Sequence, residues 1–248
     1  MWTDLPRPVI IAHRGDSAHA PENTLAAFHL AIANRADAIE FDVKLSADGE
    51  VIVLHDQTVD RTTNGHGDVR NLSLAALRDL DAGARFDARY RGERIPTLEE
   101  VFEAVGRRIH MNIELTNYAT PNDALVEKVV ALVKKHQLQE WVLFSSFLPR
   151  NLRRAQELLP EIPRGQLAWR GWVGWPARTF GWRGHFALHP YQTDVNKNLV
   201  SRLHHAGKRI FVWTVNQETE MQRLLHLGVD GIFTDDPALL RRVIGRDA

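Results

Sequence analysis

Short apolar runs alternate with amphipathic stretches from one end of the 248-residue chain to the other. Apolar runs bounded by turn residues predict buried strands, and apolar residues spaced three and four apart predict helices. We expect strands at residues 8–15, 38–46, 50–56, 110–115, 141–146, 165–169, 185–190, 209–215 and 231–234. We expect helices from Asn23 or Thr24 to about Ala33 and at residues 98–107, 122–136, 149–159, 197–206, 218–227 and 237–244.

This alternation predicts an α/β protein, a TIM (β/α)8 barrel that spans residues 1–248 as a single domain. A doubly wound open sheet is the main alternative. Residues 57–97 break the rhythm, because they are rich in Asp, Arg, Asn and Gly and contain one weak helix at 74–80. We interpret them as a small subdomain inserted after the second barrel strand, behind a hairpin that turns at Asp48-Gly49.

Composition narrows the classes of function. Basic and acidic residues balance at 31 each, so we expect no nucleic-acid partner, and any preference for an anionic substrate must come from local residues. The chain has no cysteine, which excludes disulfides and a thiolate nucleophile. Its apolar runs fall short of the roughly 18 residues of a membrane span, and the N-terminal run is too short for a secretion signal. We therefore expect a cytoplasmic protein with no stable membrane insertion.

Carboxylates stand at the ends of the early predicted strands. In a barrel, residues at the carboxyl ends of strands face the active-site mouth. Glu40 and Asp42 are two apart on one strand and so share a face, and Glu114 ends another strand. Three carboxylates cannot gather without a cation, because like charges at short range repel or force protonation. We predict a site for one divalent cation, and oxygen ligands favour Mg²⁺ or Ca²⁺ over Zn²⁺.

Two histidines and an arginine belong to the same rim. His13 and Arg14 close the first predicted strand, and His55 closes the third. Imidazoles titrate near neutral pH, so one can deprotonate an attacking group while the other protonates a leaving alkoxide. Arg14 offers a forked donor to phosphate oxygens. With a metal ion, this set predicts cleavage of a phosphodiester of a small molecule.

Further motifs follow one another along the chain: His13-Arg14-Gly15, Pro21-Glu22-Asn23-Thr24, Ile39–Val43, Asp48-Gly49, His55-Asp56, Arg61–Gly65, Asn112–Glu114, Val212–Asn216 and Asp230–Asp235. Together they resemble the glycerophosphodiester phosphodiesterase family over essentially the whole chain. The resemblance implies a TIM barrel with a small insertion. It also implies hydrolysis of glycerophosphodiesters, such as glycerophosphocholine and glycerophosphoethanolamine, to sn-glycerol 3-phosphate and an alcohol.

The resemblance assigns His13 and His55 as the acid/base pair, without saying which is which, and Arg14 as a phosphate contact. The metal ligands that it implies are Glu40, Asp42 and Glu114. One position departs from the family, whose members commonly carry Glu-x-Lys where this chain has Glu114-Leu115-Thr116. Thr116 donates a hydrogen bond but supplies no charge, so we expect weaker substrate binding or a changed phosphate pose.

Three residues near the ends of later strands are further candidates for substrate binding. We interpret Trp213 as a wall of the glycerol pocket. His189 either faces the mouth or belongs to the core, and Asn216 either contacts substrate or caps the next helix.

The segment Trp169–Trp182 is rich in tryptophan and arginine. Such residues suit weak contact with a lipid interface, but we favour their packing on the barrel as an irregular helix and loop. The segment supports an alternative function, a lysophospholipase D-like or sphingomyelinase D-like activity on lipids. A non-catalytic barrel that binds phosphate ligands is a second alternative, and the two histidines count against it.

Overall fold

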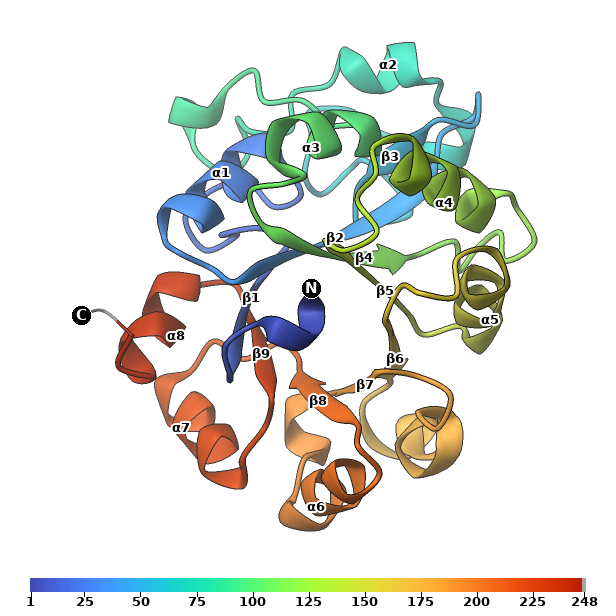
Figure 1. The fold of residues 1–248 in the computed structure, drawn as a ribbon. Coiled ribbons are helices and arrows are strands. Elements are labelled where there is room, and N and C mark those ends of the chain that lie inside the picture. The colour runs from blue at the N-terminus through green and yellow to red at the C-terminus, as the bar shows by residue number, and fades with distance from the viewer. Residues whose placement is uncertain (247–248) are drawn as a thin grey trace.

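The computed structural model describes residues 1–246, and a closed barrel of parallel strands forms its centre (Figure 1). Strand β1 pairs with β2 on one side and with β9 on the other, which closes the sheet. The barrel strands are β1 (Val9–His13), β2 (Ala38–Leu45), β4 (His110–Leu115), β5 (Val142–Ser146), β6 (Arg164–Ala168), β7 (Ala187–Pro190), β8 (Arg209–Val212) and β9 (Gly231–Thr234). The predicted TIM barrel is confirmed, and the open-sheet alternative was wrong.

Amphipathic helices surround the barrel (Figure 1). They are α1 (Leu25–Ala33), α3 (Leu98–Val105), α4 (Leu125–Lys135), α5 (Pro149–Leu158), α6 (Lys197–His205), α7 (Glu218–Leu227) and α8 (Pro237–Val243). Thr24 caps α1 by accepting a hydrogen bond from the Ala27 N–H, as one of the two predicted caps. None of the helices within residues 1–246 has the length and apolar character to cross a bilayer.

Strand register brings the polar residues to one end of the barrel in two levels. His13 on β1 lies level with Glu40 on β2, which lies level with Asn112 on β4. Asp42 lies one step further along, level with Glu114. The residues between them point outward into the helix layer, because side chains alternate along a strand. The predicted site residues of three strands therefore share one mouth.

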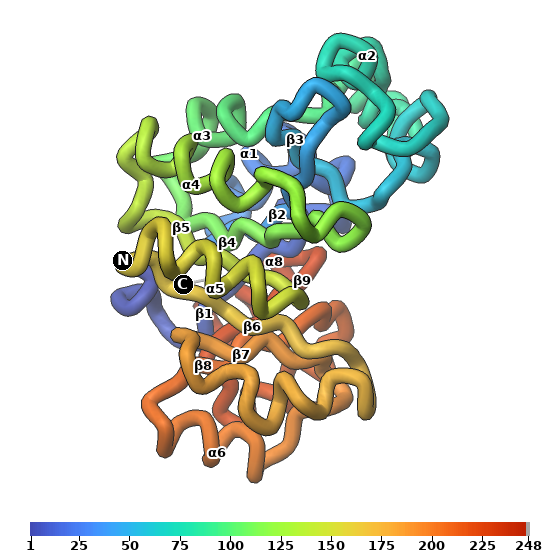
Figure 2. The backbone as a smooth tube through the Cα atoms, turned by 90° about the vertical axis from the view of Figure 1, so that its right-hand side faces the viewer, coloured from blue at the N-terminus to red at the C-terminus, as the bar shows by residue number. Residues whose placement is uncertain are grey.

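The insertion forms a small unit with its own core. Strand β3 (Val51–Val53) pairs antiparallel with β2 and leads into η2 (Val69–Asn71), α2 (Leu74–Arg78) and η3 (Ala88–Tyr90). Its buried core comprises Ile52, Leu54, Val59, Val69, Leu77, Ala82 and Ile95. Figure 2 shows α2 on the side of the molecule opposite the N-terminus, beyond the carboxyl ends of the strands. The insertion therefore stands beside the mouth of the barrel.

Candidate active site

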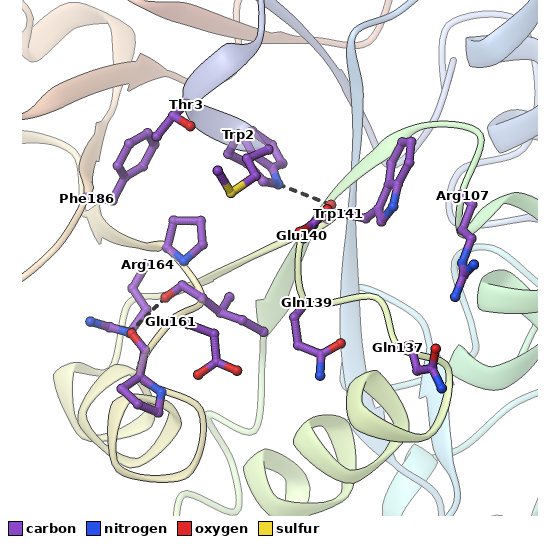
Figure 3. Close-up of a pocket in the computed structure, with 14 residues that line it drawn as sticks. Trp2, Thr3, Arg107, Gln137, Gln139, Glu140, Trp141, Glu161, Arg164 and Phe186 are labelled. Atoms are coloured by element: carbon purple, nitrogen blue, oxygen red, sulfur yellow. Dashed lines mark hydrogen bonds between the residues drawn. The ribbon is translucent and has the colours of Figure 1, made fainter.

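Two cavities lie at opposite ends of the barrel. The larger, about 950 Å³, surrounds the short helix η1 (Trp2–Asp4) at the amino ends of the strands (Figure 3). None of the predicted site residues lines it. The smaller, about 70 Å³, lies at the carboxyl ends and is lined by His13, Arg14, Glu40, Asp42, His55, Asn112, Glu114, Phe147, Leu167, Trp213 and Phe233. The smaller cavity is the candidate active site, because the predicted acid/base pair and metal ligands line it. We call it the catalytic pocket.

Three carboxylates converge in the catalytic pocket. Glu40, Asp42 and Glu114 each place a carboxylate oxygen within 4.8 Å of the others. Burial and the negative charge of Asp42 raise the pKa of Glu114 to about 8, and burial with the same neighbour raises the pKa of Glu40 well above its ordinary value. Burial also acts to raise the pKa of Asp42, but Arg14, the two histidines and a hydrogen bond from Asn23 together outweigh it and lower that pKa. The triad therefore carries repulsion that one cation would relieve.

The oxygen donors fit a hard divalent cation. Asn112, on the same strand face as Glu114, donates through Nδ2 to Ser145 Oγ at 2.9 Å. Its Oδ1 is buried without a hydrogen-bond partner and belongs to the wall of the catalytic pocket. Three carboxylates and a free amide oxygen are the ligands that Mg²⁺ and Ca²⁺ prefer. The site can therefore hold a divalent cation through Glu40, Asp42 and Glu114.

Both predicted histidines are anchored by an aspartate. His13 Nδ1 lies 2.7 Å from Asp235 Oδ1, and His55 Nδ1 lies 2.6 Å from Asp56 Oδ1. Burial opposes ionisation of both aspartates, but hydrogen bonds from His13 to Asp235 and from Arg61 to Asp56 lower their pKa values below the ordinary range. An ionised carboxylate only accepts, so each Nδ1 carries the proton. Each neutral ring then keeps a lone pair on Nε2, the atom that can exchange a proton with a substrate.

Arg14 is embedded in a network of acidic residues. Its backbone N–H donates to Glu40 Oε2 at 3.0 Å, its Nη1 donates to Glu22 Oε1 at 2.8 Å, and its Nε lies 3.5 Å from Asp42 Oδ2. That Nε is buried and makes no hydrogen bond within the described residues. Arg14 lines the catalytic pocket, so its guanidinium places a positive charge beside the carboxylate triad.

A second arginine, which the sequence analysis gave no role, extends this network to the insertion. Arg61 Nη1 and Nη2 donate to the two oxygens of Glu22 at 2.6 and 2.7 Å, and its Nε donates to Asp56 at 2.6 Å. The paired donors match the two carboxylate oxygens in geometry. Through Asp56, Arg61 also supports the ring of His55. The insertion is thereby tied to the catalytic pocket.

The structure changes the interpretation of Thr116. Its Oγ1 donates to the Val43 carbonyl at 2.7 Å, and the residue lines a neighbouring cavity rather than the catalytic pocket. Lys44 lines that same cavity and lies on the β2 face that carries Glu40 and Asp42. Its Nζ donates to the carbonyls of His55 and Asp56, each at 2.6 Å. A cation that the sequence analysis missed therefore stands beside the position where the family commonly has lysine.

Two of the three later candidates do not line the catalytic pocket. His189 is fully buried, and burial lowers its pKa to about 3. Its ring occupies the space opposite Gly165, where a Cβ would lie 2.2 Å from Nε2. A substrate contact by His189 therefore conflicts with its place in the core. Asn216 lies next to Asp235: its Nδ2 donates to Asp235 Oδ2 at 2.5 Å, and its Oδ1 accepts from the Asp235 backbone N–H at 2.9 Å.

Trp213 does line the catalytic pocket, with its Nε1 donating to the His189 carbonyl at 2.8 Å. Phe147, which the sequence analysis did not single out, lines the pocket beside it. The two rings meet edge to face, with centroids 5.6 Å apart. One wall of the pocket is therefore aromatic, facing the carboxylates and imidazoles.

The segment Trp169–Trp182 packs on the barrel only in part. Trp182 is buried, as expected, at 6% exposure. Trp172 and Trp175 are exposed, at 87% and 56%, so the favoured packing was wrong for these two. The segment folds as η4 (Gly171–Gly174) and a π-helical turn (Ala177–Gly181) in place of a regular α-helix.

Known proteins are similar to this chain in sequence and in fold. The sequence profile of the glycerophosphoryl diester phosphodiesterase family matches residues 13–239. The chain belongs to the glycerophosphodiester phosphodiesterase family. A glycerophosphodiester phosphodiesterase of Caldanaerobacter subterraneus subsp. tengcongensis is 40% identical over 239 residues, which cover 96% of this chain and 98% of the relative. This phosphodiesterase is accordingly a hydrolase of phosphoric diesters.

Solved structures agree with the sequence relatives. An Oleispira antarctica phosphodiesterase, in complex with the product sn-glycerol-3-phosphate, superposes with a TM-score of 0.87 at 34% identity. The match covers 96% of this chain and 97% of that one. A glycerophosphodiester phosphodiesterase from Agrobacterium tumefaciens gives a TM-score of 0.79 at 30% identity, with 94% and 98% covered.

Proposed function

We propose that this phosphodiesterase hydrolyses glycerophosphodiesters such as glycerophosphocholine and glycerophosphoethanolamine to sn-glycerol 3-phosphate and an alcohol. It does so with a divalent cation, Mg²⁺ or Ca²⁺, held by Glu40, Asp42 and Glu114. The observation that carries the proposal is the pair of Asp-anchored imidazoles beside a buried carboxylate triad. The product bound in the Oleispira relative supports the choice of substrate.

His13 and His55 divide the proton transfers in this proposal. One Nε2 accepts the proton of a water molecule as its oxygen bonds to phosphorus, and the other Nε2 donates a proton to the alcohol oxygen as its bond to phosphorus breaks. If the neighbouring glycerol hydroxyl attacks first, the same two transfers release the alcohol and leave a cyclic phosphate, which water then opens to sn-glycerol 3-phosphate. When bound, the cation offsets negative charge on the phosphoryl oxygens. Asp235 and Asp56 stabilise whichever ring becomes charged, because their carboxylates contact Nδ1.

Fixed cations orient the phosphate. Arg14 lines the pocket and directs its guanidinium charge towards the phosphate. Lys44 supplies the second cation in place of the lysine that Thr116 replaces, since Lys44 lies near Asp42 and Glu114 and borders the same side cavity as His55. Trp213 and Phe147 bound the space left for the glycerol and alcohol groups.

One assay tests the proposal. Glycerophosphocholine is incubated with the protein and Mg²⁺, Ca²⁺ or a chelator, and sn-glycerol 3-phosphate is measured. We expect release with at least one of the two cations and its loss with the chelator, because the triad needs a counter-charge. Unchanged release in chelator would contradict the cation. Failure to release product from either glycerophosphocholine or glycerophosphoethanolamine would contradict the substrate, provided that cation binding still raises Tm and so shows an intact site.

A further inference from the structure

Residues 169–183 lie in the connection between β6 and β7, and we name them the rim segment. In this segment a charged side chain is buried and large apolar side chains are exposed. Arg178 lies beneath it, with its side chain only 14% exposed. Its guanidinium donates to the carbonyls of Trp169 and Gly171 at 3.0 and 2.6 Å, and to Asp194 Oδ2 at 2.9 Å. The charged group is therefore inside, where it satisfies backbone carbonyls that no regular helix pairs.

Large apolar side chains cover the outside of the rim segment. They are Trp172, Val173, Trp175 and Phe180, all exposed. Trp175 and Phe180 meet edge to face with centroids 5.9 Å apart. Scattered apolar residues are ordinary on a protein surface, but a cluster within one short connection indicates a contact with something apolar.

The rim segment is held in this shape. A Cβ on Gly174 would lie 1.8 Å from the Trp169 carbonyl oxygen, so the turn requires glycine there. The Arg178 carbonyl accepts hydrogen bonds from Trp182 Nε1 at 3.1 Å and from Arg202 Nη2 at 2.7 Å. The exposed rings are therefore presented by a fixed backbone, which lowers the entropy lost when they bind.

The charges that the rim segment itself carries have one sign, and Asp194, which contacts the segment, is paired with Arg178. From residue 162 to residue 193 the sequence has four arginines and no Asp or Glu, although the whole chain is neutral. Arg170 and Arg183 are exposed beside the apolar side chains. Indole rings with neighbouring cations match the region of a phospholipid layer where acyl chains meet anionic headgroups. Charge complementarity therefore favours an anionic lipid surface over a neutral one.

The rim segment is continuous with the catalytic pocket. Trp169 stacks on Phe147 with centroids 3.8 Å apart and planes inclined by 18°. Phe147 lines the catalytic pocket and contacts Trp213. Figure 2 shows the connection between β6 and β7 on the same side of the barrel as α2. An apolar path therefore leads from the catalytic pocket through Phe147 to Trp169, which is itself 48% exposed at the start of the rim segment.

We propose that the rim segment docks this phosphodiesterase on the surface of an anionic phospholipid layer. Trp172 and Trp175 enter the interface, and Arg170 and Arg183 contact acidic headgroups. The catalytic pocket then opens beside the lipid, so glycerophosphodiesters that carry an acyl chain reach it along the Trp169–Phe147 stack. This last consequence rests on the proposed function, whereas docking itself requires no catalysis.

Cosedimentation with vesicles tests the docking. The wild type should bind vesicles of phosphatidylcholine with phosphatidylglycerol more tightly than vesicles of phosphatidylcholine alone. The double variant Trp172→Ala/Trp175→Ala should lose about tenfold or more in affinity, because two interfacial rings are removed. Phe86→Ala removes one exposed ring from the insertion and should leave binding unchanged. Equal binding by wild type and double variant, equal loss in the Phe86 variant, or no binding to either vesicle overturns the proposal.

Two activity measurements separate docking from chemistry. The double variant should release sn-glycerol 3-phosphate from soluble glycerophosphocholine at the wild-type rate, since neither tryptophan lines the catalytic pocket. Its release of choline from lysophosphatidylcholine embedded in anionic vesicles, which leaves the acylated glycerol 3-phosphate in the vesicle, should fall by about the loss in vesicle affinity. Inactivity of the wild type on both substrates, with vesicle binding that depends on the two rings, would overturn the proposed function and leave the docking standing.

Discussion

The two ends of the barrel use the same residue types in different ways. At the amino end, His110 packs between Trp2 and Trp141, with ring centroids 5.9 and 4.8 Å away, and burial lowers its pKa to about 4. At the carboxyl end, His13 and His55 each contact an ionised aspartate. A histidine without a carboxylate partner is a neutral packed ring, whereas a histidine anchored at Nδ1 is ready to transfer a proton. The histidines of the two ends therefore differ in whether a carboxylate contacts the ring, not in the size of the cavity beside them.

The arginines of the two ends show the same contrast. Arg164, at the larger cavity, donates from Nη1 to the carbonyls of Pro160 and Ile162, and burial lowers its pKa (Figure 3). Arg14, at the smaller one, has carboxylates of Glu22 and Asp42 beside it. The amino end closes the bottom of the barrel with satisfied backbone groups, a stabilising role. The carboxyl end concentrates charges that only a cation and a phosphate would balance.

The largest expected effect separates the histidines of the two ends. His13→Ala and His55→Ala should each lower kcat on glycerophosphocholine by about 10²–10⁴, because each removes a proton-transfer group. His110→Ala should leave kcat within about twofold and instead lower Tm, because it opens a gap between two tryptophans. Steady-state kinetics and thermal denaturation of the three variants measure this. A large loss of kcat in His110→Ala would remove the distinction.

A smaller effect tests whether Lys44, at the carboxyl end of the barrel, binds the phosphate. Lys44→Met should raise KM by about tenfold with kcat less affected, since a charge-assisted contact is lost. Lys128→Met is the matched control, because Lys128 Nζ also donates to a backbone carbonyl, that of Gly49, at 2.6 Å. Adding Thr116→Lys to Lys44→Met should restore KM if charge on this side of the site is what matters. A fall in kcat alone would instead assign Lys44 to holding His55.

The smallest effect concerns stability and has opposite signs at the two ends. The pKa of Glu114 is about 8 in the folded protein against an ordinary 4.5, so the metal-free protein should lose stability as pH rises from 4.5 through 8. The pKa of His110 is about 4 against 6.5, so stability should also fall as pH drops from 6.5 towards 4. Each group contributes at most about 1.4 kcal/mol per pH unit.

Thermal denaturation as a function of pH measures both losses of stability: the one at high pH, the alkaline limb, and the one at low pH, the acid limb. Glu114→Gln should make the alkaline limb shallower, because it removes one of the two triad carboxyls whose pKa is raised and leaves Glu40. Saturation with the cation should flatten the limb further, because the ion favours the ionised form of both carboxyls. His110→Phe keeps a ring between the tryptophans and should make the acid limb shallower. The buried His185 and His189, whose pKa values are also lowered by burial, maintain the rest of that limb. An alkaline limb unchanged in Glu114→Gln would contradict the triad's electrostatics.

The sequence predicted the barrel and the carboxylate triad well, for physical reasons. Strand alternation is a local property, so Glu40 and Asp42 had to share a face once their strand was recognised. Gathered carboxylates require a counter-charge whatever their exact geometry. Thr24 was recognisable as a cap because its hydroxyl acts only three residues along the chain.

Features that depend on distant neighbours were not predictable from the sequence. His189 fills the space opposite Gly165, and nothing local to His189 shows that a glycine lies across from it. Lys44 gains its place from pairing between β2 and β4, where Val43 lies level with Leu115 and so brings Lys44 beside Thr116. The exposure of Trp172 depends on Arg178 turning inward, a reversal that composition alone could not indicate.

The contact between His13 and Asp235 joins positions 222 residues apart, at the end of the first barrel strand and directly after the last one. A polypeptide still being synthesised can have every other strand in place and yet leave His13 without its anchor. Catalysis therefore begins only when β9 and Asp235 have been synthesised and β9 has closed the ring. Recovery of activity during refolding should follow closure of the barrel, while the recovery of helical signal precedes it.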